Sequence, residues 1–229
     1  MPEIAVVAGE TSGDIHAGNL VAALRRIRPD AKVWAVGGER LAAAGAEIAY
    51  PSERIAAMGL TEVLGRLPAL REVRALVAER FRENPPALFV PVDFGGLNLR
   101  LCAEAKKAGI PVVYFIPPKA WAWGSWRVAK VRALVDELLV ILPFEEGFWN
   151  ERGVKATYVG SPVLDHLGAR RFEPEPDVVG LLPGSRMGEI RRIWPQLLGA
   201  ARILAGRRKL RFLAPRAEGL PADCLDAGD

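Results

Sequence analysis

The 229-residue sequence lacks the motifs that mark several common classes of enzyme. It contains no His-Glu-x-x-His, no Gly-x-Ser-x-Gly and no Gly-x4-Gly-Lys-Ser/Thr sequence, which removes the usual signatures of zinc peptidases, serine hydrolases and P-loop nucleotide hydrolases. Cys102 and Cys224 are the only cysteines, and they lack Cys-x-x-Cys or metal-ligand spacing. This argues against a disulfide scaffold and suits a reducing compartment. His16 and His166 are isolated as well, so the sequence predicts no metal site.

Long apolar runs and a strong charge imbalance are also missing. No stretch approaches the roughly 18 apolar residues of a membrane-spanning helix, and no signal peptide precedes the first apolar run. The net charge is only +4. In the long first part of the chain the basic side chains form no patch interleaved with aromatics, which disfavours a nucleic-acid-binding module. The sequence predicts a cytoplasmic protein, or one peripheral to the inner face of a membrane.

Half of the residues are hydrophobic, and they fall into short apolar runs that alternate with helical patterns. The runs that predict strands are 4–8, 33–36, 88–92, 112–116, 138–142, 156–159, 178–182 and 210–214. Helical patterns cover 15–28, 71–82, 96–108, 126–135, 144–152 and 189–205. Strands that are apolar throughout and separated by helices are typical of a parallel sheet covered on both faces. The sequence therefore predicts an α/β fold with a doubly wound parallel sheet.

The pattern lapses between residues 161 and 177, where Arg170, Arg171, Pro174 and Pro176 stand close together. We therefore expect a first Rossmann-like domain over 1–165, a linker over 166–177 and the start of a second Rossmann-like domain over 178–229. Two strands and one helix cannot cover both faces of a doubly wound sheet. The sequence favours a fragment of a longer protein over a short piece that docks on the first domain.

The segment from Gly9 to Asp14 joins the first predicted strand to a helix. Glycines permit close approach of the backbone, and a strand–turn–helix unit directs N–H groups toward a ligand. We take Ser12, Gly13 and Asp14 as candidate ligand-binding residues; the alternative is a plain helix capped by Ser12 or Asp14. The spacing differs from the Gly-x-Gly-x-x-Gly dinucleotide motif, which weakens a nicotinamide oxidoreductase as an interpretation.

Asp93 directly follows the run 88–92 and is followed by two glycines and Asn98. A carboxylate at the carboxyl end of a central parallel strand lies at the crevice where such folds bind ligands. It could act as a general base on a sugar hydroxyl. The alternative is that Asp93 only caps the next helix.

Trp121, Trp123 and Trp126 follow the run 112–116, again at a strand end. Indoles in a crevice loop suit a sugar ring or an apolar ligand, although they could also serve packing. The segment 55–70 is apolar with few charges and is either a buried helix or a surface for acyl chains or a bilayer.

The stretch 181–186 ends a predicted strand with Pro-Gly-Ser-Arg and precedes a helix. Gly184, Ser185, the helix N-terminus and the guanidinium of Arg186 together could cradle a diphosphate.

Taken together and in order, these segments resemble the bacterial lipid-A-disaccharide synthases. The resemblance is collinear to about residue 205 and rests on AGETSGD at 8–14, VGG at 36–38, MGLTEVLGRLP at 58–68, VDFGGLN at 92–98, AKKAGIPVVYFIPPKAWAW at 105–123, RVAKVRALVDELLVILPFEEGFW at 127–149, YVGSPVLD at 158–165 and LLPGSRMGEI at 181–190.

The resemblance implies a two-domain glycosyltransferase of the GT-B kind, whose first half holds the acceptor and whose second half holds UDP. Such an enzyme joins UDP-2,3-diacylglucosamine to 2,3-diacylglucosamine 1-phosphate and releases UDP, with inversion and without a metal or another cofactor. It implies that the protein binds the surface of the bacterial inner membrane and that it does not bind nucleic acid. It leaves open whether the protein forms a homodimer. With so short a second domain, we expect this chain alone to be inactive.

By position, the resemblance makes Asp93 the base and places Arg186 near the diphosphate. It matches Ser12, Gly13 and Asp14 to the first turn, and Asn98 to the asparagine after the base. The sequence departs from the family near these positions: it has Pro117-Pro118 for the usual Ser-Pro, Ser161 for the usual histidine of Gly-His-Pro, and no proline in the Asp93 loop.

A non-catalytic remnant that keeps a lipid-binding or dimerising surface is the alternative interpretation. Sugar transfer requires that the loops of Asp93 and the three tryptophans open into one cleft that faces Arg186.

Overall fold

The computed structural model describes residues 2–56, 66–167, 173–217 and 220–226. The chain divides into two compact units, Met1–Gly168 and Ala169–Asp229.

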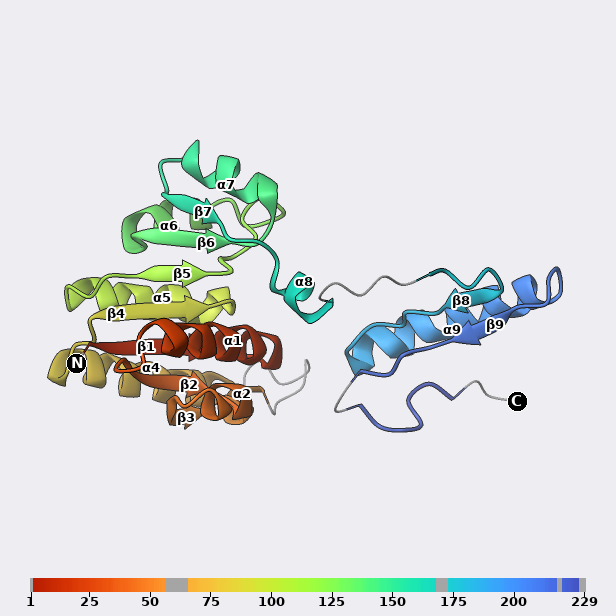
Figure 1. Ribbon diagram of the computed structural model, residues 1–229, viewed down its shortest axis with the longest axis horizontal. Coiled ribbons are helices and arrows are strands. Elements are labelled where there is room, and N and C mark those ends of the chain that lie inside the picture. The colour runs from red at the N-terminus through yellow and green to blue at the C-terminus, as the bar shows by residue number, and fades with distance from the viewer. Residues whose placement is uncertain (1, 57–65, 168–172, 218–219, 227–229) are drawn as a thin grey trace. The chain divides into compact units, whose positions relative to one another are not determined.

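The first unit is built on a seven-stranded sheet in which every strand pairing is parallel (Figure 1). The strands are β1 (Glu3–Ala8), β2 (Lys32–Gly37), β3 (Glu47–Pro51), β4 (Leu88–Val92), β5 (Val113–Phe115), β6 (Glu137–Val140) and β7 (Ala156–Tyr158). Their order across the sheet is β3-β2-β1-β4-β5-β6-β7. The chain moves outward from β1 in one direction and then from β4 in the other, which confirms the predicted doubly wound parallel sheet. The switch point lies between β1 and β4.

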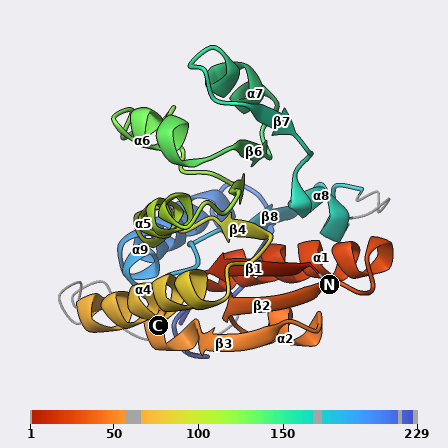
Figure 2. The ribbon, with the colours of Figure 1, turned by 90° about the vertical axis from the view of Figure 1, so that its left-hand side faces the viewer.

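Helices cover both faces of this sheet (Figures 1 and 2). They are α1 (Thr11–Ile27), α2 (Glu39–Ala43), α3 (Glu53–Ala56), α4 (Arg66–Glu83), α5 (Gly95–Lys107), α6 (Arg127–Leu134), α7 (Pro143–Asn150) and α8 (Pro162–Leu167). Successive side chains of a strand point to opposite faces. Accordingly, Val6 of β1 packs in one apolar cluster with Val21 of α1. Val7 packs in the other with Val77 of α4 and Leu101 of α5.

Four short elements differ from the sequence-based prediction. Strand β3 and helices α2, α3 and α8 have four to six residues each, and none was predicted. Strand β3 lies at the edge of the sheet, where an uninterrupted apolar run is not required. Helices of this length complete too few turns for a hydrophobic period to appear.

The second unit contains a parallel pair of strands, β8 (Val178–Gly180) and β9 (Arg211–Leu213), and helix α9 (Met187–Ala205). Leu181, Ile190, Trp194 and Ala201 form its buried apolar cluster. The indole N–H of Trp194 donates to the carbonyl oxygen of Asp226 at 3.0 Å. This arrangement matches the strand–helix–strand pattern predicted for 178–214.

Cys102 lies on α5 and its side chain is fully buried. Burial raises the pKa of its thiol from 9.0 to about 12. At pH values between these two pKa values, the unfolded chain therefore binds fewer protons than the folded chain. The free energy of unfolding consequently falls as the pH rises above about 9. We expect this thiol alone to remove about 1.4 kcal/mol between roughly pH 8 and pH 10.

Urea unfolding of the wild type and of Cys102→Ala at both pH values checks this expectation. Other groups titrate in both proteins, so the difference between the two pH dependences isolates the thiol. An equal decrease in the two proteins would contradict it.

Candidate active site

Residues that follow the carboxyl ends of β1, β4, β5 and β6 line a cavity of about 460 Å³. We call it the Asp93 cavity; it is lined by Glu10, His16, Asp93, Phe94, Gly95, Gly96, Ile116, Pro117, Pro118, Lys119, Trp123, Arg127 and Ile141. It lies beside the β1–β4 switch point, where open parallel sheets bind their ligands. The structure therefore brings Asp93 and Trp123 into one cavity.

The backbone at Asp93 is held in an uncommon conformation. Asp93 has φ of 50° and Phe94 has φ of 48°, in the left-handed region that side chains other than glycine rarely adopt. Ile116, across the cavity, has φ of 57°. Each such residue costs on the order of 1–3 kcal/mol, and such residues persist only where the surroundings hold them. All three line the Asp93 cavity, so the strain is concentrated at the candidate site.

Two buried side chains hold the Asp93 turn in place. The amide Nδ2 of Asn98 donates to the carbonyl oxygens of Asp93 at 2.8 Å, Val92 at 3.2 Å and Val7 at 3.3 Å. The hydroxyl of Tyr114 donates to the same Asp93 carbonyl at 2.7 Å. Asn98 is completely buried. The structure thus gives Asn98 a positioning task, in contrast to the substrate contact that the sequence predicts for it, because its amide is engaged by the backbone of β1 and β4.

We expect Asn98→Asp to lower the free energy of unfolding by about 3 kcal/mol. The substitution removes the amide donor and turns a carboxylate oxygen toward carbonyl oxygens in a buried site. Urea unfolding measures the loss. Asn19→Asp is the control, since it makes the same change at an exposed position of α1. A loss equal to that of the control would contradict the positioning role.

Asp14 is also engaged by the backbone, although it was predicted to bind substrate or to cap its own helix. Its carboxylate accepts hydrogen bonds from the N–H groups of Gly38 at 2.7 Å, Arg40 at 3.0 Å and Leu41 at 3.3 Å. Gly38 is the N-cap of α2, whereas the N-cap of α1 is Glu10, which has no side-chain cap. Asp14 therefore caps the neighbouring helix α2. The prediction that it caps α1 is wrong.

The other residues of the first turn shape the cavity differently. Ser12 is exposed and Gly13 is buried, and neither lines the Asp93 cavity. A Cβ added to Gly9 would overlap the ring of Phe94, so a glycine is required where the turn after β1 meets the turn after β4. Close approach of the backbone, expected from the glycines, occurs at Gly9.

The three indoles have different surroundings. Trp121 donates from Nε1 to Glu145 Oε1 at 2.8 Å and packs edge-on against Phe144 of α7. Trp123 is 65% exposed and lines the Asp93 cavity. Trp126 is 63% exposed and lines a neighbouring groove instead. Trp123 is thus the indole best placed to contact a ligand of the Asp93 cavity, and Trp121 anchors the loop.

Four polar residues of the Asp93 cavity were not predicted as site residues: Glu10, His16, Lys119 and Arg127. The guanidinium of Arg127 stacks on the rings of Trp123, at 4.7 Å from the centroid, and Trp126, at 5.1 Å. Lys119 and Arg127 flank the tryptophan run in the sequence, and His16 lies within α1 shortly after its start. The sequence feature that could have identified these four residues is their closeness to the ends of the predicted strands. Lys119 and Arg127 bring positive charge to the cavity, and Glu10 adds a second carboxylate to that of Asp93.

In the second unit, the Pro-Gly-Ser-Arg turn ends on the N-terminus of α9. Gly184 has φ of 103°, which requires glycine. The N–H of Ser185 donates to Glu189 Oε2 at 3.0 Å, and Arg186 lies 3.5 Å from Glu189 Oε1. The hydrogen bond from Ser185 and the charge of Arg186 lower the pKa of Glu189. The carboxylate of Glu189 thus contacts the Ser185 N–H and Arg186, which the sequence predicts to receive a diphosphate.

The chain matches one protein family over most of its length. The family model described as lipid-A-disaccharide synthetase matches residues 4–216. The chain is 44% identical over 233 residues to the lipid-A-disaccharide synthase of Myxococcus xanthus, covering 94% of this chain and 59% of the relative. With that of Geobacter metallireducens it shares 37% identity over 228 residues, covering 95% of this chain and 59% of the relative. The chain belongs to this family. It spans about three fifths of the length of these relatives.

Solved structures confirm the GT-B-like α/β architecture of the chain. It resembles UDP-GlcNAc 2-epimerase from Neisseria meningitidis with a TM-score of 0.63 at 12% identity, covering 97% of this chain and 67% of that one. It resembles Acinetobacter baumannii MurG with a TM-score of 0.51 at 12% identity, covering 97% and 69%. At such identities these likenesses show the fold alone.

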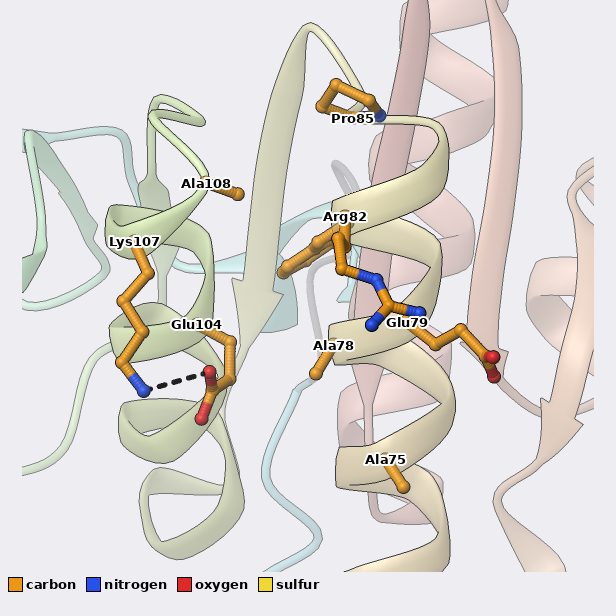
Figure 3. A pocket seen from close by; sticks show the side chains of 9 residues that line it. Ala75, Ala78, Glu79, Arg82, Pro85, Glu104, Lys107 and Ala108 are labelled. Carbon is orange, nitrogen blue, oxygen red and sulfur yellow. Dashed lines mark hydrogen bonds and ion pairs between the residues drawn. The ribbon is translucent and has the colours of Figure 1, made fainter.

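A cavity of about 720 Å³ lies between α4 and α5, away from the Asp93 cavity, and Figure 3 shows Glu104 and Lys107 of α5 and Arg82 of α4 among its lining. Most of the apolar segment 55–70, predicted to serve acyl chains or packing, lies outside the described residues. Within the described ranges, no helix is long and apolar enough to cross a membrane, and no cluster of three potential metal ligands occurs.

Proposed function

We propose that this chain is the acceptor-binding part, with the start of the UDP-binding part, of a lipid-A-disaccharide synthase. The reaction transfers 2,3-diacylglucosamine from UDP-2,3-diacylglucosamine to 2,3-diacylglucosamine 1-phosphate and releases UDP. The observation that carries the proposal is the Asp93 cavity. A carboxylate held in a strained turn at the switch point of the sheet shares this cavity with an exposed indole and two cations, in a chain of this family.

Asp93 acts as the general base in this mechanism. Its carboxylate accepts no hydrogen bond from any other described residue, and the side chain is partly exposed to the cavity. It takes the proton of the acceptor hydroxyl as the hydroxyl oxygen attacks the anomeric carbon of the donor. The bond between that carbon and the UDP oxygen breaks, and UDP leaves with the bonding electrons. Attack opposite to the leaving group inverts the anomeric centre.

The departing diphosphate needs positive charge and N–H donors. Arg186, the Ser185 N–H and the N-terminus of α9 supply both. Glu189 presently accepts from Ser185 and pairs with Arg186, so its carboxylate must yield to the diphosphate when UDP-sugar binds. The Neisseria epimerase, which shares the fold, is bound to UDP-GlcNAc in its crystal structure, and this is compatible with a UDP-sugar ligand here.

The acyl chains of both sugars make the surface of the bacterial inner membrane the natural location of the reaction. We propose peripheral attachment on its cytoplasmic side and a mechanism that needs no metal ion.

The direct test is a transfer assay with both diacylated sugars. It uses the 229-residue chain and a form extended at its C-terminus to the length of the relatives. We expect the extended form to yield one disaccharide per UDP released, detected by mass spectrometry, with unchanged rates in EDTA, and the shorter chain to yield none. Lipid binding by the extended form without any disaccharide would support a non-catalytic lipid-binding protein instead.

A further inference from the structure

A groove between α5 and α6 adjoins the Asp93 cavity and is strongly basic. We call it the α5–α6 groove; it has a volume of about 450 Å³ and is lined by Arg74, Gly95, Gly96, Leu99, Arg100, Ala103, Glu104, Lys107, Trp126, Arg127, Lys130 and Leu134. Five of these side chains are cationic and one is a carboxylate. This corrects the expectation that the first part of the chain has no basic patch with an aromatic side chain.

Not all of this charge is balanced within the groove. Glu104 pairs with Arg74 at 2.5 Å and with Lys107 at 3.2 Å, and Figure 3 shows the Lys107 contact. The guanidinium of Arg74 lowers the pKa of Glu104. Arg100, Arg127 and Lys130 form no ion pair with any carboxylate among the described residues. These three cations are available to an anionic ligand.

The N-terminus of α5 opens into the same groove. Gly95 and Gly96, its first two residues, line the groove and also the Asp93 cavity. The N-cap, Phe94, offers no side-chain acceptor to the N–H groups of the first turn. A helix N-terminus without a cap, beside cations, favours a phosphate group. Trp126, under Arg127 and Lys130, adds an exposed indole face that suits a sugar ring.

Because the α5–α6 groove adjoins the Asp93 cavity, we propose that the groove binds the phosphate of the acceptor. The acceptor is a sugar 1-phosphate whose ring occupies the Asp93 cavity. Gly95, Gly96 and Arg127 line both spaces, so a phosphate on the N-terminus of α5 lies next to a sugar whose hydroxyl faces Asp93. Arg100 and Lys130 hold the phosphate from the two sides of the groove, and Arg127 spans the phosphate and the ring. This inference rests on the proposed function, because it assigns part of the acceptor to each space.

The test measures binding of glucosamine 1-phosphate, which lacks acyl chains, to the 229-residue chain by ³¹P NMR and calorimetry up to about 10 mM, with glucosamine as the ligand without phosphate. The double variant Arg100→Ala/Lys130→Ala should bind glucosamine 1-phosphate about tenfold more weakly. The matched control is Arg26→Ala/Arg132→Ala, which removes the same charge from exposed positions outside the groove. It should bind as the wild type does. Thermal unfolding followed by circular dichroism checks that both variants are folded.

Equal affinities of the two double variants, or no binding by the wild type, would overturn the inference. Binding to vesicles of phosphatidylglycerol and of phosphatidylcholine distinguishes a site for lipid headgroups from a site for the acceptor phosphate. If the groove variant loses only its binding to phosphatidylglycerol vesicles, the groove serves the membrane and the inference is wrong.

The assay also separates this inference from the proposed function. Disaccharide formation that depends on Asp93, together with phosphate binding that is indifferent to Arg100 and Lys130, would overturn the groove alone. Groove-dependent binding of glucosamine 1-phosphate without any sugar transfer would overturn the proposed function and leave the phosphate site supported.

Discussion

Asp93→Asn should lower the turnover number of the C-terminally extended form of the chain by about 10²–10⁴-fold, because an amide cannot take the proton of the attacking hydroxyl. The affinity for both sugars should change little, since asparagine has the shape of aspartate. The fold should also be unchanged, because the Asp93 carboxylate accepts no hydrogen bond from the rest of the described chain, and the turn is held through the Asp93 carbonyl. Initial rates of disaccharide formation at saturating substrate measure the effect.

Asp30→Asn is the matched control for this substitution. Asp30 precedes the amino end of β2, whereas the Asp93 cavity lies at the carboxyl ends of the strands, and its exposed carboxylate pairs with Arg28. We expect the control to retain the wild-type rate. An Asp93→Asn enzyme that also retains it would exclude Asp93 as the base, and a variant that loses affinity with unchanged turnover would reassign Asp93 to substrate binding.

Asp14→Ala should lower the free energy of unfolding by about 3–4 kcal/mol. The Asp14 carboxylate is buried and serves three backbone N–H groups at the start of α2. Hydrogen bonds to a charged group are worth about 1.5–3 kcal/mol each, and donors left unpaired in a buried site cost a further penalty. Urea unfolding monitored by circular dichroism measures the loss.

This result distinguishes the two roles considered for Asp14. A structural cap predicts the large loss of stability, with a smaller loss for Asp14→Asn, which keeps one oxygen acceptor. A substrate-binding carboxylate predicts a higher KM with stability within about 0.5 kcal/mol of the wild type. A stable Asp14→Ala protein with weakened acceptor binding would therefore contradict the role that its contacts indicate.

Much of the fold could be predicted because buried parallel strands are apolar at every position. The runs 4–8 and 88–92 coincide with β1 and β4 to within a residue. Strand β3 could not be predicted in this way, because it lies at the sheet edge and is only partly buried. For the short helices α2 and α8, the sequence offered turn residues but no complete period.

The candidate site was partly predictable for a similar reason. In a parallel sheet the residues after each strand gather at one edge, so Asp93 and Trp123 could be expected to share a cavity. The contacts of Asp14 and Asn98 could not, because their partners lie as far as 27 and 91 residues away in sequence. Likewise, the cations of the α5–α6 groove come from α4, α5 and α6, and only the folded chain gathers them around Trp126.

The position of Arg186 relative to Asp93 stays a prediction, since the two residues belong to different units. Within its own unit, the guanidinium of Arg186 and the N–H of Ser185 share the carboxylate of Glu189.

Photo-crosslinking of the acceptor to the 229-residue chain tests most directly whether the Asp93 cavity is the acceptor site. The probe is 2,3-diacylglucosamine 1-phosphate with a diazirine on the sugar ring, and adducts are located by peptide mass spectrometry. We predict adducts on the loops 93–96 and 116–123 that disappear when unlabelled acceptor competes. Adducts that avoid both loops and lie only within the second unit would contradict the account.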